Sequence, residues 1–357
     1  MRYVATGLWL ILALGACSDS NGQGDGRPAD RWIGDGPPPV VDQGPPGENK
    51  PQLTVSDKAP ATTARLVFIH HSVGENWLRP DEGNLIGELN KNNYYVTDTN
   101  YEWGPDKIGD NTDIGHWYDW FLGPKRDTYM AAVYKNTTLT DSVAPNSISD
   151  PGGEASIVMF KSCFTQGPHL SGNAGDPPLA EGSPNPIYGK DAGNQDIYYT
   201  VTNVKGMYRD LLKYFATRQD KLFVLITPPP SEQSQATAEN MSALRGVTNW
   251  LVEQLLQSYP HNNVGVFDFS LVLTSNGGST TVNDVGAATG SHHRFRSGTV
   301  EHLVGPSPYL QYWSDGPDNH PTAAGSKKAT AELVPLLNIL YNCWKKTSGC
   351  PRLMGKK

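Results

Sequence analysis

Two segments far apart in the chain carry side chains that can act together as a nucleophile and its base. In the first segment the apolar run LVFI leads into two histidines and Ser72, and in the second, YWSDGPDNHPT, acidic residues precede His320. A serine hydroxyl becomes a useful nucleophile when an imidazole takes its proton and a carboxylate orients that imidazole. The residue types therefore predict Ser72 as a nucleophile and His320 as a general base that later acts as an acid.

The carboxylate of this set has two candidates. Asp318 lies two residues before His320, and Asp315 lies five residues before it. Both positions fall in a Gly-Pro segment, where aspartate is also a common turn residue, so a purely structural role is the alternative for each. The residues alone leave the choice between them open.

The elements that must position these side chains can be predicted from the flanking sequence. Runs of Leu, Val, Phe and Ile are typical of strands buried in a parallel sheet, and reacting groups gather outside the carboxyl ends of such strands. The alternative for Ser72 is that it only caps the helix that follows. At the second segment, Pro321 favours extended backbone at His320, and Thr322 can cap the last helix.

Further strand and helix patterns alternate along the chain. Apolar runs predict strands at 94–99, 156–160, 222–226 and 264–269, and helical periodicity lies at 85–89, 204–215 and 241–255. This alternation predicts an α/β fold, a flavodoxin-like three-layer α/β/α domain with a parallel sheet of about five strands. Long loops at 100–151, 166–195 and 274–318 are expected to border a cleft.

The strand ending at Ser72 and the late Asp-x-His-Pro segment resemble the SGNH/GDSL hydrolase superfamily, here with an HHS-type first block. The resemblance spans roughly residues 61–342 and implies a serine hydrolase that acts on carboxylic esters. The family's usual acid position, three residues before the histidine, is Pro317 in this chain. We favour Asp318, because nearby families with this kind of site tolerate a spacing of two residues, and keep Asp315 in reserve.

A tetrahedral intermediate needs two or three hydrogen-bond donors aimed at its oxyanion. The Ser72 backbone N–H is expected to be the first donor. The resemblance implies a second donor from a glycine in the next block of the family, for which we choose Gly109, with Gly115 in reserve.

The family's third oxyanion donor is an asparagine side chain after the third strand. This chain has Lys161-Ser162-Cys163 at that place, which is a departure from the family pattern. Asn76, Ser162 and Asn111 are the possible substitutes, and a catalytic defect relative to the family is an open alternative.

Three further residues are predicted to contact the substrate, namely His71, Trp117 and Ser162. His71 can hydrogen-bond across the site, and tryptophans in the insert can stack on sugar rings, although core packing is the alternative for them. Paired histidines can also ligate a metal, but no acidic partner lies nearby at ligand spacing, so we expect no metal and no cofactor.

The N-terminal region predicts export and anchoring. Residues 1–16 contain one early positive charge and a short apolar stretch, as in a secretory signal, and Leu14-Gly15-Ala16-Cys17 resembles a bacterial lipobox. We expect lipidation of Cys17, with an ordinary signal peptide as the alternative, and a location in the cell envelope, at the outer membrane, or in the secreted fraction. Residues 17–60, rich in Gly and Pro, predict a disordered tether before the SGNH-like domain at 61–345 and a tail at 346–357.

Composition excludes some classes of partner. The chain has 357 residues and a formal net charge of −7, which argues against a nucleic-acid partner. Its cysteines are too few and too poorly spaced for a zinc site. Cys343 and Cys350 can close a short disulfide loop worth about 2.5 kcal/mol, which leaves Cys163 unpaired.

These patterns together predict a surface-anchored serine esterase that removes acyl groups, acetyl foremost, from a carbohydrate or small ester. The expected partners are a small-molecule or polysaccharide ester and, through the lipid anchor only, a membrane. Two alternatives remain at this point. One is a lipoprotein of the same fold that binds glycan without turnover, and the other is an acyltransferase that uses the same three side chains.

Overall fold

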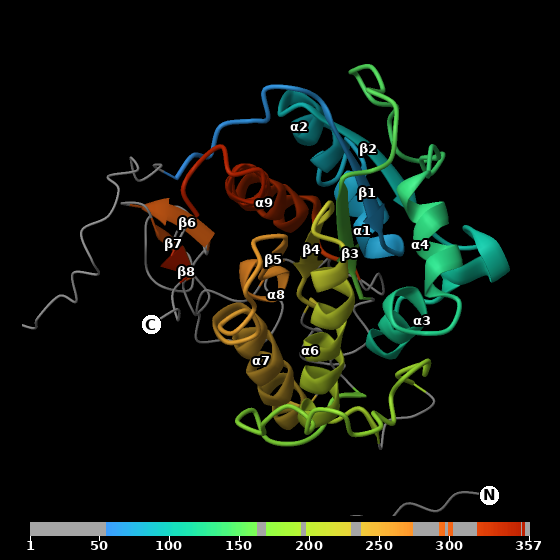
Figure 1. The fold of residues 1–357 in the computed structure, drawn as a ribbon, viewed down its shortest axis with the longest axis vertical. Coiled ribbons are helices and arrows are strands. Elements are labelled where there is room, and N and C mark those ends of the chain that lie inside the picture. Colours follow the sequence, from blue (N-terminus) through green and yellow to red (C-terminus); the bar gives the residue numbers. More distant parts are fainter. Residues whose placement is uncertain are drawn as a thin grey trace, which may run out of the picture. The chain divides into compact units, whose positions relative to one another are not determined.

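The computed structural model describes residues 55–162, 169–193, 198–229, 237–273, 293–296, 299–302, 320–350 and 352–353. Its central feature is a five-stranded, all-parallel sheet in the order β2-β1-β3-β4-β5 (Figure 1). The strands are β1 (Ala64–Ile69), β2 (Tyr94–Thr99), β3 (Ile157–Lys161), β4 (Leu222–Ile226) and β5 (Val264–Phe267). The predicted α/β fold and its flavodoxin-like strand order are confirmed.

The inner strands form because their sequences are apolar on both faces. Every residue of β1, β3 and β4 is buried. Alternate side chains enter different cores: Val67 and Ile69 of β1 belong to one apolar cluster, and Leu66 and Phe68 belong to the other. Two buried faces require a covering layer on each side of the sheet.

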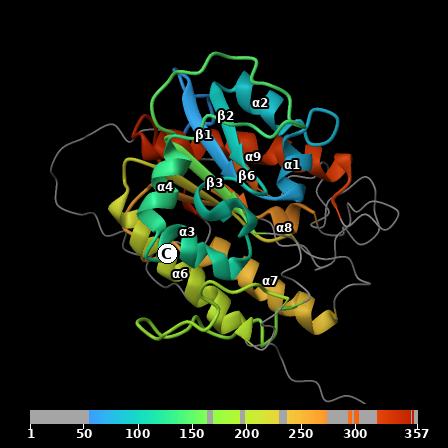
Figure 2. The same ribbon diagram turned by 90° about the vertical axis from the view of Figure 1, so that its right-hand side faces the viewer.

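Helices supply both layers (Figures 1 and 2). The cluster around Val67 includes side chains of α3 (Trp117–Phe121), α4 (Arg126–Tyr134), α6 (Val201–Thr217) and α7 (Ala238–Glu253). The cluster around Leu66 includes side chains of α1 (Ser72–Leu78), α2 (Leu85–Lys91), α8 (Phe269–Val272) and α9 (Ala323–Trp344). The helix that begins at Ser72 and the helix that follows His320 therefore share one face of the sheet.

Two of the predicted loops contain regular structure. The insert at 100–151 folds into η1 (Pro105–Asp110), η2 (Ile114–His116), α3 and α4, because its aromatic residues at helical spacing, such as Trp117, Trp120 and Phe121, pack into the core. The predicted loop at 274–318 contains β6 (His293–Arg296) and β7 (Thr299–His302). With β8 (Arg352–Leu353) these strands form a second, three-stranded sheet.

Helices α1 and α9 are joined by a buried tryptophan. The Trp77 ring stacks on Phe269 with a centroid distance of 4.7 Å, and its Nε1–H donates to Thr330 Oγ1 at 2.9 Å. The Thr330 hydroxyl in turn donates to the Gly83 carbonyl at 2.8 Å. Since Trp77 lies on α1 and Thr330 on α9, this contact sets how the two helices lie against each other.

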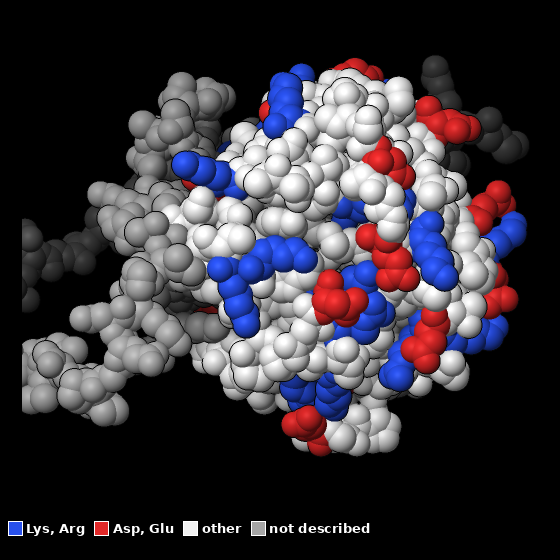
Figure 3. All heavy atoms as spheres, turned by 45° about the horizontal axis from the view of Figure 1, so that its top comes forward, with Lys and Arg blue, Asp and Glu red and all other residues white. Residues whose placement is uncertain are grey.

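The C-terminal end of α9 carries the predicted disulfide, which the structure forms between Cys343 and Cys350. The predictions for Cys17 and Cys163 lie outside the described residues. Within the described part of the chain, no helix is both long and apolar enough to cross a bilayer. On the face drawn in Figure 3, basic and acidic side chains are interspersed.

The Trp77–Thr330 contact generates a stability prediction. Replacing Thr330 by Val removes the hydroxyl at nearly constant volume and leaves the buried indole N–H unpaired, so we expect the free energy of unfolding to fall by about 2 kcal/mol. Urea unfolding measures this change. Thr330→Ser keeps the hydroxyl and is the matched control, and a Val variant as stable as the Ser variant would contradict the role of the hydrogen bond.

Candidate active site

The turn from β1 into α1 is held by hydrogen bonds that converge on one carbonyl group. His71 has extended backbone angles (φ −123°, ψ −160°), and the helix begins at the next residue, Ser72. The His71 carbonyl accepts from Gly74 N–H at 2.8 Å and from Glu75 N–H at 3.1 Å. It also accepts from His70 Nδ1 at 2.8 Å. Three donors on one oxygen leave the backbone at Ser72 little freedom.

His70 lies beneath this turn as the partner of a buried aspartate. Its Nε2 is 2.9 Å from Asp98 Oδ2, and both residues are almost fully buried. Asp98 also accepts from the Thr140 backbone N–H and hydroxyl, each at 2.7 Å. A carbonyl and a carboxylate can only accept, so both contacts of the ring are satisfied when His70 is an imidazolium paired with Asp98.

Gly74 allows the first turn of α1 to close over the His70 ring. A Cβ atom at this position would lie 2.3 Å from His70 Cβ and 2.5 Å from Cγ, which is far inside contact distance. The glycine two residues after Ser72 is therefore required by close packing.

His71 is held on the other side of the turn in its neutral form. Its Nε2–H donates to the Gly109 carbonyl at 2.7 Å, and its ring stacks on Tyr101 with a centroid distance of 4.0 Å. Burial lowers the pKa of His71 to about 4; the hydrogen bond to Gly109 opposes this shift, and the positive charge of Lys161 adds to it. With the proton on Nε2, the Nδ1 atom of His71 is a hydrogen-bond acceptor.

Ser72 and His320 meet at the carboxyl edge of the sheet. His320 Nε2 lies 2.7 Å from Ser72 Oγ, although the two residues are 248 positions apart in the chain. Both are partly exposed. His320 precedes α9, whose first turn is capped by the Thr322 hydroxyl, which accepts from Gly325 N–H at 3.2 Å. The sequence predicts that Ser72 and His320 lie together, and in the structure they are within hydrogen-bonding distance of each other.

The helix-capping alternative for Ser72 does not hold. The N-cap position of α1 is His71, no side chain caps this helix, and Ser72 is its first residue. The Ser72 hydroxyl instead contacts the His320 imidazole. The candidate acids Asp318 and Asp315 lie outside the described residues.

The predicted second oxyanion donor has to be corrected. The Gly109 N–H donates to the Trp103 carbonyl at 2.9 Å, and the Gly115 N–H donates to the Tyr199 hydroxyl at 3.0 Å. Both amides are thus already used. A Cβ on Gly109 would lie 2.1 Å from the Asn100 carbonyl oxygen, so this glycine serves close packing, and it contributes its carbonyl rather than its N–H to the site through His71.

Other donors remain at the start of α1. Among the described residues, none accepts from the backbone N–H of Ser72 or of Val73. Asn76 lies one helical turn after Ser72 and is partly exposed, so its side-chain amide is a further candidate donor. The backbone N–H groups of Ser72 and Val73 and the Asn76 side-chain amide are therefore the candidate donors for an oxyanion among the described residues at the start of α1.

Two predicted substrate contacts belong to the core instead. Trp117 is fully buried and packs edge-on against Phe160, so it cannot stack on a sugar. Ser162 is 1% exposed, and its hydroxyl lies 3.3 Å from the Tyr208 hydroxyl. Both were misassigned because the sequence shows that a polar or aromatic residue follows a strand, but not which way its side chain points.

Sequence reasoning missed Asp98 and Tyr101. Asp98 interrupts the carboxyl end of a buried strand, in Thr97-Asp98-Thr99, where polar side chains face the reacting edge of a parallel sheet. That signal was available in the sequence. Tyr101 follows directly after the strand, but only its stacking on His71 indicates a connection to the site.

In one cluster of possible metal ligands, the position of the histidine ring proton does not suit metal binding. Asp113, His116 and Asp191 place one ligand atom each within 4.8 Å of the others. The Asp113 N–H donates to His116 Nδ1 at 3.3 Å, which puts the ring proton on Nε2, 3.2 Å from Asp191 Oδ1. A metal on Nε2 needs that nitrogen unprotonated and normally has a donating Nδ1–H, which is the reverse. The cluster is a hydrogen-bonded junction between η2 and the segment at Asp191.

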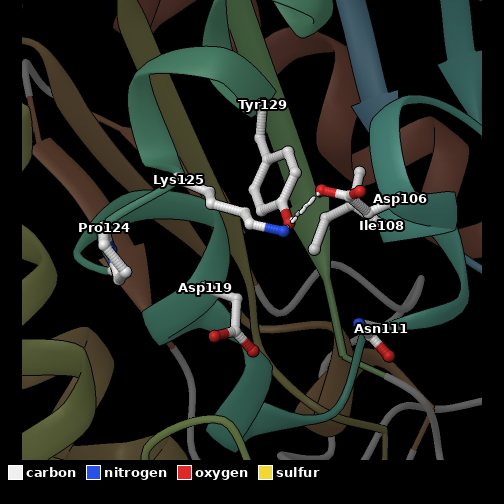
Figure 4. Close-up of a pocket in the computed structure, with 8 residues that line it drawn as sticks. Asp106, Ile108, Asn111, Asp119, Pro124, Lys125 and Tyr129 are labelled. Carbon is white, nitrogen blue, oxygen red and sulfur yellow. Dashed lines mark hydrogen bonds and ion pairs between the residues drawn. The ribbon is translucent and has the colours of Figure 1, made fainter.

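A cavity of about 380 Å³ lies between η1 and the connection from α3 to α4 (Figure 4). Lys125 Nζ and the Tyr129 hydroxyl both donate to Asp106 Oδ2 at 3.0 Å, so these three polar side chains are already hydrogen-bonded to one another. Burial raises the pKa of Asp119, which also lines the cavity. None of the described lining residues bonds to Ser72 or His320, and we do not assign this cavity to the candidate active site.

Comparison with known protein families finds no family model that matches the chain, and comparison with curated proteins finds no significant match. The case for a function therefore rests on the geometry of the site itself.

The buried His70–Asp98 pair generates a second stability prediction. Asp98→Asn removes the carboxylate and turns an amide N–H toward existing donors, so we expect the free energy of unfolding to fall by about 3 kcal/mol or more. Urea unfolding at neutral pH measures it. Asp81→Asn, at an exposed ion pair, is the control and is expected to change stability little. Equal effects of the two changes would argue against a buried charged pair.

The lowered pKa of His71 generates a prediction for the pH dependence of stability. The folded chain binds this proton only near pH 4, whereas the unfolded chain binds it near its ordinary value of 6.5, so acidification through this window favours unfolding. His71→Gln keeps a donor for Gly109 but cannot titrate. Between pH 6.5 and 4, the free energy of unfolding of this variant is expected to fall less than that of the unsubstituted protein. The difference between the two falls is expected to reach up to about 3 kcal/mol. Parallel pH curves for the two proteins would contradict a buried neutral His71.

Proposed function

We propose that the chain is a serine esterase that hydrolyses carboxylic esters, with acetyl esters of carbohydrates as its foremost substrates. The observation that carries the proposal is the 2.7 Å contact between Ser72 Oγ and His320 Nε2 at the carboxyl edge of a parallel sheet. This is the distance and the place at which a serine hydroxyl and its base work in α/β hydrolases of many kinds.

The reaction would proceed in two halves. Ser72 Oγ attacks the ester carbonyl carbon while its proton moves to His320 Nε2, and the carbonyl oxygen becomes an oxyanion near the N–H groups of Ser72 and Val73. Collapse of this intermediate breaks the ester C–O bond, and His320 gives its proton to the departing alcohol. Water, deprotonated by His320, then attacks the acyl carbon; the bond from this carbon to Ser72 Oγ breaks, His320 returns the proton to Oγ, and the carboxylic acid leaves.

The surroundings of Ser72 suit this role. The His70–Asp98 pair and the three donors on the His71 carbonyl hold the backbone at Ser72, so the hydroxyl is positioned before substrate arrives. His71, next to it, is a weak base, because burial lowers its pKa to about 4, so it is a poor acceptor for the serine proton. Anchoring through Cys17 would place this chemistry at the cell envelope.

The proposal predicts a loss of activity on single substitutions. In the full chain, Ser72→Ala and His320→Gln are each expected to lower kcat for p-nitrophenyl acetate by at least about 10³-fold, since members of such a pair act as a unit. Ser171→Ala, at an exposed serine, is the control and should match the unsubstituted protein.

A fluorophosphonate probe gives an independent measurement, because it should label Ser72 and mass spectrometry can locate the adduct. Hydrolysis that is equal with and without Ser72, or labelling only at another serine, would refute the nucleophile assignment. If no ester is turned over but acyl transfer to an added sugar is observed, the same residues serve an acyltransferase.

A further inference from the structure

The side chain that lies on His71 is the most exposed large aromatic residue of the described part of the chain. Tyr101 is 53% exposed, and Tyr198, at 37%, is the other exposed large apolar side chain among these residues. One face of the Tyr101 ring stacks on His71, directly beside Ser72. An exposed aromatic ring that is held rigidly next to a nucleophile is suited to binding a flat apolar surface of a substrate.

Tyr101 lines a cavity of about 360 Å³ whose walls combine apolar surface with several hydrogen-bond acceptors. The lining includes the acidic residues Glu102 and Asp141 and the hydroxyl group of Thr138. Asn100 also lines the cavity, and its Nδ2 donates to Glu75 Oε2 at 2.7 Å. The carboxylate and hydroxyl oxygens of this lining can accept hydrogen bonds from the hydroxyl groups of a ligand.

The charges that line the cavity disfavour charged ligands. Glu102 is paired with Lys107 at 2.9 Å, and Asp98, deeper in the wall, is paired with His70, while the third carboxylate, that of Asp141, is exposed and screened by solvent. Paired carboxylates exert little net attraction on a cation, and acidic walls disfavour an anion. An acyl chain would leave the acceptors without donors. A neutral ligand with many hydroxyl groups and one apolar face satisfies both the ring and the acceptors.

We propose that this cavity is a subsite for a neutral carbohydrate, with a sugar ring stacked on Tyr101 and sugar hydroxyl groups donating to oxygens of Glu102, Asp141 and Thr138. The inference rests on the proposed function for its purpose, because the subsite would hold an acylated glycan with its ester at Ser72. It replaces Trp117 as the aromatic contact, since Trp117 is buried in the core.

Binding can be tested without turnover. The full chain carrying Ser72→Ala is titrated by calorimetry with soluble hexasaccharides of xylose, glucose, mannose and N-acetylglucosamine. We expect at least one of them to bind, Tyr101→Ala in this background to weaken binding at least about tenfold, and Tyr101→Phe, which keeps the ring, to retain it. Tyr198→Ala, at the other exposed tyrosine, is the matched control and should bind as before.

The outcomes separate this inference from the esterase proposal. If none of the four hexasaccharides binds at millimolar concentration, or if Tyr101→Ala binds as well as Tyr101→Phe, the subsite is refuted, whatever the esterase measurements show. If binding depends on Tyr101 but no ester is turned over, the subsite stands and the esterase proposal falls. Thermal unfolding of each variant shows whether a loss of binding reflects a loss of folded protein.

Discussion

The position of Ser72 depends on the His71 carbonyl, which accepts hydrogen bonds from Gly74 N–H, Glu75 N–H and His70 Nδ1. This oxygen lies where the chain changes from strand to helix within one residue. Such a sharp change leaves the first backbone groups of the helix without helical partners, and here the N–H of Ser72, which has no acceptor among the described residues, is next to the hydroxyl that would attack a substrate. The turn that exposes the serine thus also supplies a donor for the charge that the reaction creates.

Two buried contacts connect this turn with the rest of the domain. The His70–Asp98 pair joins it to β2, and the Trp77–Thr330 hydrogen bond joins α1 to α9. The second contact matters for chemistry, because α9 begins just after His320. A helix–helix contact in the core therefore decides whether an imidazole and a hydroxyl from opposite ends of the chain can meet.

The two adjacent histidines have different chemical roles because their surroundings differ. The His70 ring faces a carbonyl and a carboxylate, an environment that is satisfied by a charged imidazolium. His71 faces a single carbonyl and an aromatic ring, and burial keeps it neutral. One histidine is part of the support beneath Ser72, and the other connects the nucleophile to Tyr101 and to the cavity beside it.

The sequence by itself determined the order of strands and helices and the location of Ser72 at a strand end. It also determined the capping of α9 by Thr322 and the pairing of Cys343 with Cys350. These features could be predicted because periodicity, caps and short loops are local properties. It did not determine which way side chains point after a strand, so Trp117 and Ser162 were misplaced, Gly109 was assigned an N–H that is already used, and Tyr101 was missed. Only the tertiary structure decided these points. Side-chain direction, burial and the use of each hydrogen-bonding group depend on neighbours that are distant in the chain, such as the contact of β2 with β1 and of α9 with α1.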